Sequence, residues 1–103
     1  MKAWQHEELR RALELRRDAL VGELERDAER VREERFTEVS QAELARDSDE
    51  LRAIESACRR IVDGSYGVCV DCGAEIGFER LHAEPEAPRC VACQVRHERT
   101  YRS

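Results

Sequence analysis

The chain has 103 residues, which is enough for one small domain or a small domain with an appendage, and too few for a large hydrophobic core. Charged residues make up 40% and aromatic residues only 5%, a composition typical of long solvated helices. The net charge of −5 disfavours direct binding to DNA, and no stretch approaches the ~20 apolar residues of a membrane span.

Residues 5–35 are predicted to form one long helix, because they contain no proline and a single glycine, Gly22. Their apolar residues recur at steps of four and seven: Leu9, Leu13, Leu20, Leu24 and Val31. The resulting 11-residue repeat is close to the period of a straight helix, so it lays one apolar stripe along it. That stripe needs a partner.

The partner is predicted to be a second helix that begins near Ser40, where Ser40-Gln41-Ala42-Glu43 has the pattern of a capping box, and stops at Gly64. Its apolar seam is a heptad pattern, interrupted by Asp47 and made of Leu44, Leu51, Ile54, Cys58 and Ile61. A turn around residues 35–39 would join the helices into an antiparallel hairpin about 40 Å long. One continuous helix that dimerises would bury the same stripes and remains the alternative.

The strongest signal is a pair of Cys-x-x-Cys motifs with 17 residues between them: Cys69, Cys72, Cys90 and Cys93. Two such turns give four thiolates in the tetrahedral arrangement that Zn²⁺ accepts, and Gly73 stands where a zinc-binding turn needs a positive φ. We therefore expect one structural zinc ion. With no open coordination position, this metal argues against an enzyme.

Three other interpretations of the cysteines carry less support. An iron–sulfur cluster also takes four thiolates. A redox motif is disfavoured because nothing near Cys69 has the pattern of a βαβ unit. Structural disulfides would need an oxidising compartment, whereas residues 1–8 lack the apolar segment of a signal peptide, so we expect a cytoplasmic protein.

Between the two pairs, Ile76 and Phe78 have strand character, and Leu81 is expected to point inward and cover the metal. Residues 94–101 predict a short polar C-terminal helix. The expected fold is mostly α: an antiparallel two-helix coiled-coil hairpin over residues 1–62, followed over residues 63–103 by a small four-cysteine zinc finger and the short helix.

Three further side chains near the motifs can be interpreted from their positions. Because Cys58 lies on the apolar seam, we expect its thiol to be buried in the core, with redox sensing as the alternative. His97 has the spacing of a helical ligand after Cys93, but four cysteines already fill the coordination sphere, so we expect it at the surface. His82 is expected at the surface as well.

The residues around the cysteines also follow a known pattern, in the runs Asp63-Gly64-Ser65-Tyr66-Gly67-Val68-Cys69-Val70-Asp71-Cys72-Gly73, Ile76, Arg80-Leu81-His82-Ala83-Glu84-Pro85-Glu86-Ala87 and Cys90-Val91-Ala92-Cys93-Gln94. Together these runs cover about 35 residues, and they resemble the zinc finger of the DksA/TraR family. The resemblance implies a bacterial cytoplasmic regulator whose hairpin enters the secondary channel of RNA polymerase and alters transcription initiation, often together with ppGpp. It also places Arg80 on the arginine of the family's finger motif, where we expect a structural role, with a polymerase contact as the alternative.

The expected hairpin tip departs from the family. The resemblance implies two aspartates and an alanine there, whereas this chain has glutamates around residues 33–38: Glu33, Glu34 and Glu38. We therefore expect a zinc-binding regulator that binds RNA polymerase, with these glutamates as candidate partner-binding residues. The alternative is a zinc-stabilised coiled-coil interaction module without polymerase activity. A monomer is favoured, a dimer is the alternative, and sequence-specific DNA binding is not expected.

Overall fold

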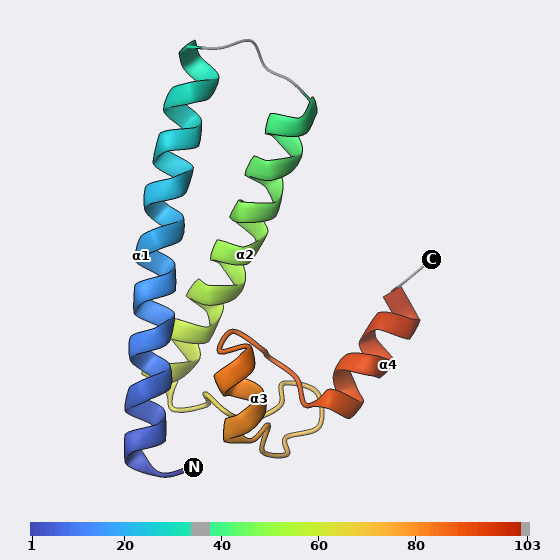
Figure 1. Ribbon diagram of the computed structural model, residues 1–103. Coiled ribbons are helices and arrows are strands. Elements are labelled where there is room, and N and C mark those ends of the chain that lie inside the picture. Colours follow the sequence, from blue (N-terminus) through green and yellow to red (C-terminus); the bar gives the residue numbers. More distant parts are fainter. Residues whose placement is uncertain (34–37, 102–103) are drawn as a thin grey trace.

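The computed structural model describes residues 1–33 and 38–101, with the side chains of residues 1–29 and 42–100. These residues form four helices: α1 (Ala3–Glu33), α2 (Glu38–Asp63), α3 (Phe78–Ala83) and α4 (Val91–Tyr101) (Figure 1). The described residues contain no extended strand, and an isolated antiparallel bridge joins Val68 to Glu75. The mostly helical fold predicted from the sequence is confirmed.

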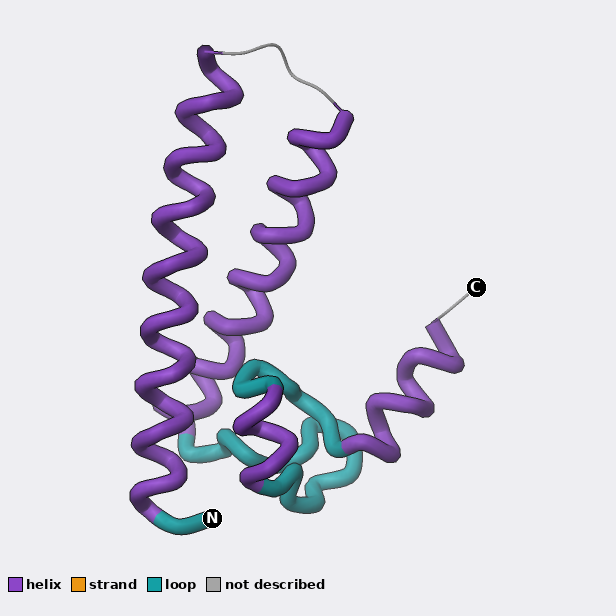
Figure 2. Tube along the Cα trace, in the orientation of Figure 1, coloured by secondary structure: helices purple, strands orange, loops and turns teal. Residues whose placement is uncertain are grey.

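The two long helices lie side by side and antiparallel, close together at the base and further apart toward the tip (Figures 1 and 2). The leucine stripe of α1 faces α2, and its first three leucines are buried together with Ile54 and Ala57 of α2. An ion pair between Arg16 and Glu50 also joins the helices. Because α1 packs against α2 of the same chain, the alternative of one continuous helix is wrong.

The second helix begins earlier than its capping pattern suggested. Within the described residues α2 begins at Glu38, so Ser40 lies inside the helix and is not its N-cap. The predicted capping box is therefore wrong, although the helix start lies within two residues of the predicted one.

The end of α2 follows the prediction. Gly64 has φ of 80°, and the backbone N–H groups of Gly64 and Ser65 donate to the carbonyl oxygens of Ile61 and Arg60 at 3.3 and 2.9 Å. These two bonds form a Schellman motif, which satisfies the last carbonyls of a helix and requires a left-handed residue at its end. The chain therefore leaves α2 and turns directly into the finger.

The expected strand at Ile76 and Phe78 is wrong, because Phe78 is the first residue of α3. This helix is only six residues long, and its Leu81 is fully buried. Leu81 packs in the same core cluster as Leu9 and Leu13 of α1, so it points inward as expected and fills the junction between the helices, while its cover of the metal stays a prediction.

The first turn of α1 also contacts the finger. The ring of Trp4 meets that of Phe78 edge-on, with centroids 5.6 Å apart, and His6 meets Tyr66 at 6.3 Å. The predicted division between residues 1–62 and 63–103 remains a prediction, since one core cluster contains residues from both ranges. No helix within the described ranges is both long and apolar enough to span a membrane.

Candidate metal centre

The first cysteine pair lies in a tight loop after α2. The N–H of Cys69 donates to the carbonyl oxygen of Ala74 at 2.8 Å, and the N–H of Gly73 donates to that of Cys69 at 3.0 Å. Gly73 has φ of 76°, the left-handed conformation predicted for this position. The loop therefore folds back on itself directly after Cys72 and turns both sulfurs to one side.

The second pair is built on the N-terminus of α4. Cys90 immediately precedes the helix and Cys93 lies in its first turn, where the N–H of Gln94 donates to the carbonyl oxygen of Cys90 at 2.9 Å. The helix begins three residues before the predicted start at residue 94, so the predicted boundary missed its first turn. A helix N-terminus stabilises negative charge, which suits the thiolate form that a metal-binding cysteine takes.

Three hydrogen bonds hold the second cysteine loop in place. The N–H of Val70 donates to the carbonyl oxygen of Pro88 at 3.0 Å, and Nε of Arg89 donates to Oδ2 of Asp71 at 2.8 Å. Nε of Arg80 donates to the carbonyl oxygen of Arg89 at 2.9 Å. This contact is the structural role expected for Arg80, and the first two bonds join the loops directly.

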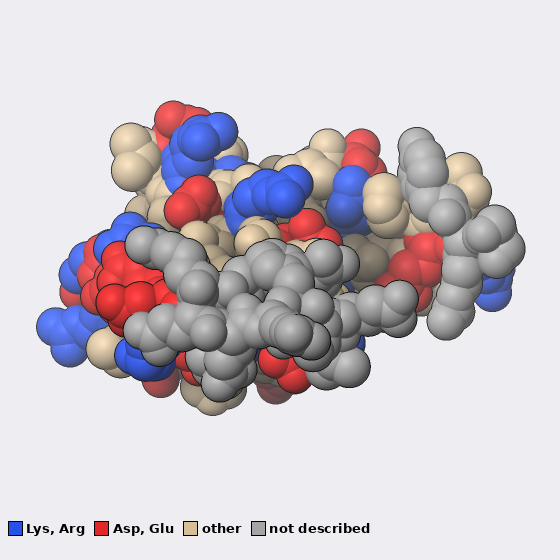
Figure 3. Space-filling model, turned by 90° about the horizontal axis from the view of Figure 1, so that it is seen from above, with Lys and Arg blue, Asp and Glu red and all other residues tan. Residues whose placement is uncertain are grey.

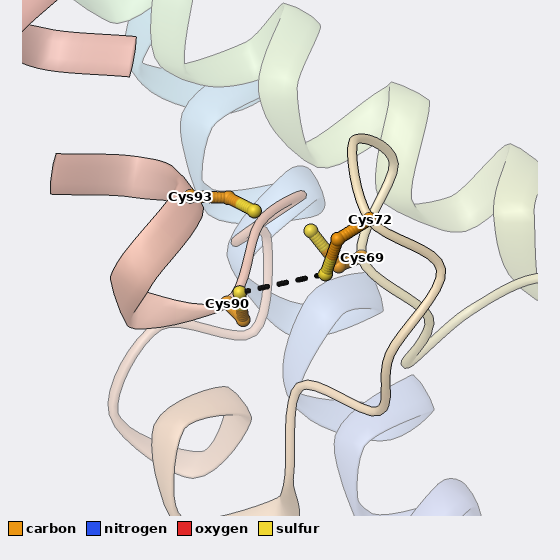
Figure 4. A group of neighbouring side chains, drawn as sticks. All are labelled: Cys69, Cys72, Cys90 and Cys93. Atoms are coloured by element: carbon orange, nitrogen blue, oxygen red, sulfur yellow. Dashed lines mark hydrogen bonds between the residues drawn. The ribbon is translucent and has the colours of Figure 1, made fainter. Parts of the chain in front are cut away.

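The four sulfur atoms converge on one point, with the two pairs facing one another (Figure 4). All four lie within 4.8 Å of one another, and those of Cys72 and Cys90 are 3.9 Å apart. A zinc ion with four Zn–S bonds of about 2.3 Å requires sulfur atoms about 3.8 Å apart. Cys69 and Cys93 are 2% and 3% exposed, whereas Cys72 is open to solvent. The arrangement fits a tetrahedral structural site.

Without a cation, the crowded sulfurs differ in acidity. Backbone N–H groups of Cys72 and Cys90 lower the pKa of the Cys69 thiol to about 6. The pKa of the Cys93 thiol is raised to about 12, first by its contact with the Cys90 sulfur and then by burial. Four thiolates this close repel one another, and a bound metal ion would offset that repulsion.

The other candidates near the site lie close to where the sequence suggested, but His97 is less exposed and Cys58 less buried than expected. Among the described residues, the group close enough to hold a metal consists of the four cysteines and does not include His97, which is partly buried. His82 is exposed and its ring lies against Phe78. Cys58 is half-buried and packs against the core cluster, so its predicted core position is confirmed but its full burial is not.

The tip glutamates are only partly covered by the structure. Glu33 is the last residue of α1 and Glu38 the first residue of α2, so these two residues lie at the ends of the helices farthest from the finger. Glu34 lies outside the described residues.

Sequence reasoning missed two contacts at the metal centre. Nη2 of Arg96 donates to Sγ of Cys93 at 3.2 Å, and Asp71 pairs with Arg89 across the two loops. The first contact has a local signal, because residues three apart on a helix are neighbours and Arg96 follows Cys93 by three. The second joins residues 18 apart in the sequence, and no periodicity indicates it.

Comparisons with known proteins agree with this geometry. The family model of the prokaryotic dksA/traR C4-type zinc finger matches residues 64–99, which contain all four cysteines. An RNA polymerase-binding transcription factor DksA of Caulobacter vibrioides is 36% identical over 107 aligned residues, covering 97% of this chain and 72% of that protein. The chain belongs to the DksA/TraR family. DksA of Escherichia coli matches over 45 residues at 38% identity, covering 44% of this chain and 30% of that protein.

Solved structures of DksA proteins share the fold. DksA2 from Pseudomonas aeruginosa superimposes with a TM-score of 0.84 at 27% identity, covering all of this chain and 90% of that one. A Dks protein from Chlamydia trachomatis, 23% identical, has a TM-score of 0.70 over all of this chain and 98% of that one, and is alike in fold. Together with the clustered cysteines, the match to the C4 finger of DksA proteins shows that this chain carries one structural zinc site.

Proposed function

We propose that this protein binds bacterial RNA polymerase and regulates transcription by inserting its hairpin into the secondary channel. The observation that carries the proposal is the 36% identity, over nearly the whole chain, to a relative named as an RNA polymerase-binding transcription factor. The likeness runs through hairpin and finger alike, so it covers both parts that such a mechanism uses. The expected compartment is the cytoplasm, where the polymerase is found.

The shape of the molecule supports insertion. The hairpin of α1 and α2 projects from the finger as a rod, within overall dimensions of 47 × 36 × 21 Å (Figure 1). At about 1.5 Å per residue, the 31 residues of α1 span roughly 46 Å, long enough to carry the tip far from the base. We propose that the glutamates of the tip, Glu33, Glu34 and Glu38, act on the groups at the end of the channel.

We propose Cys69, Cys72, Cys90 and Cys93 as the four zinc ligands. The ion would join the loop after α2 to the start of α4 and thereby fix the base from which the hairpin projects. Four protein ligands leave no open position for substrate or water, so we expect no catalytic activity. The metal's contribution is structural.

Direct recognition of DNA is not part of the proposal. Seen from above, the described Lys, Arg, Asp and Glu side chains are interspersed rather than gathered into a basic face (Figure 3). The net charge of −5 points the same way, because phosphate binding draws on concentrated positive charge. The expected partner is therefore the polymerase protein.

The test is binding of the zinc-loaded protein to purified bacterial RNA polymerase, with a known secondary-channel protein as competitor. We expect saturable binding that the competitor displaces. A matched control replaces Leu15, an exposed residue on the side of α1, with alanine and should leave the affinity unchanged. Absence of binding at micromolar concentrations, with the protein folded and zinc-loaded, would contradict the proposal.

Replacing Glu33, Glu34 and Glu38 together with glutamine separates entry into the channel from action within it. The change removes three negative charges but keeps side-chain size, so we expect polymerase binding to persist and the effect on initiation to fall. In vitro transcription from several promoters measures the effect. If the triple variant regulates like the parent protein, the tip carboxylates have no role.

A second candidate function, an interaction module without polymerase activity, is favoured by one observation. The half of the hairpin toward the tip has a depression lined by four apolar residues and two glutamates: Val21, Leu24, Ala28, Leu51, Glu25 and Glu29. Leu9 and Leu20 are already buried within the monomer, so a dimer formed through the original stripe could use only its outer part. Light scattering discriminates between the two functions: a stable dimer that does not bind polymerase would favour this candidate.

A further inference from the structure

A pocket of about 430 Å³ opens beside the metal centre. The sulfur-bearing residues Cys72 and Cys93 contribute to its wall, and so do two arginines, Arg89 and Arg96. Because Cys69 and Cys93 are buried and Cys72 is exposed, this is the side on which the site meets solvent. The side chains of this wall therefore set the electrostatic surroundings of the solvent-facing half of the site.

The two arginines make different contacts. Nε of Arg89 donates to the carboxylate of Asp71, so its charge is already partly offset. Nη2 of Arg96 instead donates to Sγ of Cys93 at 3.2 Å, from one turn further along α4. A guanidinium group is always charged and cannot be deprotonated in a protein, so this donor makes a charge-assisted hydrogen bond to the sulfur from an exposed side chain.

We infer that Arg96 is a positioning residue for the metal centre, which raises its affinity for zinc by donating to the Cys93 thiolate. Zinc with four thiolates carries a net charge of about −2, and Cys93 is 3% exposed, so water screens its share of that charge poorly. The Arg96 guanidinium offsets this charge and fixes the orientation of the sulfur. Groups of this kind around a metal typically change its affinity by about 10–100-fold.

The inference rests on the proposed ligand set but not on polymerase binding. The first test measures equilibrium zinc affinity of the full-length protein by competition with a chromophoric chelator, comparing the parent with Arg96→Leu. Leucine keeps the helix and the apolar stem but removes the donor and the charge. We expect the affinity of Arg96→Leu to fall by about 10-fold or more, with one zinc still bound per chain at saturation.

The matched control is Arg99→Leu, which makes the same charge change on the same helix at a residue that does not line the pocket. It should bind zinc as tightly as the parent. Equal losses in both variants would mean that only net charge matters, and no loss in Arg96→Leu would mean that the contact does not support the site. Either result overturns the inference, whereas failure to bind one zinc in the parent would overturn the ligand set instead.

A second measurement reads the sulfur directly. Cobalt(II) substituted for zinc shows sulfur-to-metal charge-transfer absorption, whose energy rises when an N–H donor stabilises the sulfur electrons. We expect the band of Arg96→Leu to move to lower energy and that of Arg99→Leu to stay in place. Arg96→Lys keeps the charge but loses the planar fork, so its band and zinc affinity should fall between those of parent and Arg96→Leu. A band that is the same in all four proteins would contradict a contact with the sulfur.

Discussion

Leu81 is fully buried where the hairpin meets the finger, in one cluster with Leu9 and Leu13. Replacing it with alanine should lower the free energy of unfolding by about 2–5 kcal/mol, because the change removes buried surface and leaves a cavity. Urea unfolding of the zinc-loaded protein measures the effect. Leu15→Ala is the control: Leu15 is 72% exposed, so its loss should cost at most about 0.5 kcal/mol. Equal costs would show that Leu81 is not part of the core.

Tyr66 is a second buried residue of this junction, and its hydroxyl donates to the carbonyl oxygen of Pro85 at 2.9 Å. Tyr66→Phe leaves that carbonyl without its donor and should cost about 1 kcal/mol of stability. Urea unfolding at neutral pH measures it. A cost near zero would mean that water satisfies the carbonyl equally well in the variant.

Burial raises the pKa of Tyr66 to about 12, above the value near 10 of an unfolded chain. The folded protein therefore holds this proton more tightly, so the associated stability is fully present below about pH 10 and is lost as the pH rises toward 12. The chain has two tyrosines, so titration of phenolate absorbance should show one late transition that Tyr66→Phe removes. Two transitions near pH 10 in the parent protein would refute the assignment.

At the residue scale, the sequence predicted the cysteines better than their surroundings. The spacing of the two pairs alone indicates which sulfurs can meet, because chemistry restricts what two Cys-x-x-Cys turns can bind. The buried alanines Ala57 and Ala87 were not predicted, since a small side chain gives little periodic signal. The pairing of Asp71 with Arg89 depends on how two loops approach, which no local pattern encodes.

Replacing each of two glycines at or within the long helices with alanine should change the stability of the protein in opposite directions. Gly64, at the end of α2, has positive φ with open space around it, so Gly64→Ala introduces backbone strain without a clash and should cost about 1 kcal/mol. Gly22 lies inside α1, and a methyl group there would meet only the flexible end of Arg26, at 3.4 Å. Gly22→Ala should therefore raise stability by about 0.5–1 kcal/mol. Thermal unfolding measures the stability of both variants. A change of the same sign in both would contradict the difference in backbone conformation between the two glycines.

At the scale of elements, long periodic helices were predictable and the short one was not. The stripe of α1 repeats often enough to fix both its length and the face it buries. The six residues of α3 are too few for a helical period to be recognised, and Ile76 with Phe78 gave a competing alternation typical of a strand. The hairpin was favoured over a continuous helix mainly by the family resemblance, because either arrangement buries the same stripes.

At the scale of the whole molecule, metal and core support each other. Replacing Cys69 and Cys72 together with serine should abolish zinc binding and unfold the finger, since a small metal-stabilised fold lacks a core of its own. Because Leu81 and Tyr66 belong to the core cluster shared with α1, we also expect the base of the hairpin to lose hydrogen-exchange protection.

Metal analysis and hydrogen exchange together test this prediction. Cys58→Ser is the control, because Cys58 packs against the core away from the four clustered sulfurs and its loss should leave one zinc per chain. A double variant that kept its zinc would contradict the ligand assignment. Protection that fell only in the finger would show that the hairpin base is stable alone.

The contacts of Trp4 and His6 with Phe78 and Tyr66 join residues that the ribosome makes before the hairpin to residues that it makes after the hairpin. During synthesis, the leucines of α1 stay uncovered until α2 has been made. The aromatic contacts of the first turn of α1 form later still, after the finger has emerged. Zinc uptake needs Cys90 and Cys93, which are made after the hairpin and after the first cysteine pair. The base is thus completed in a single late step, and a chain that stalls before Cys90 would present an exposed leucine stripe to chaperones and proteases.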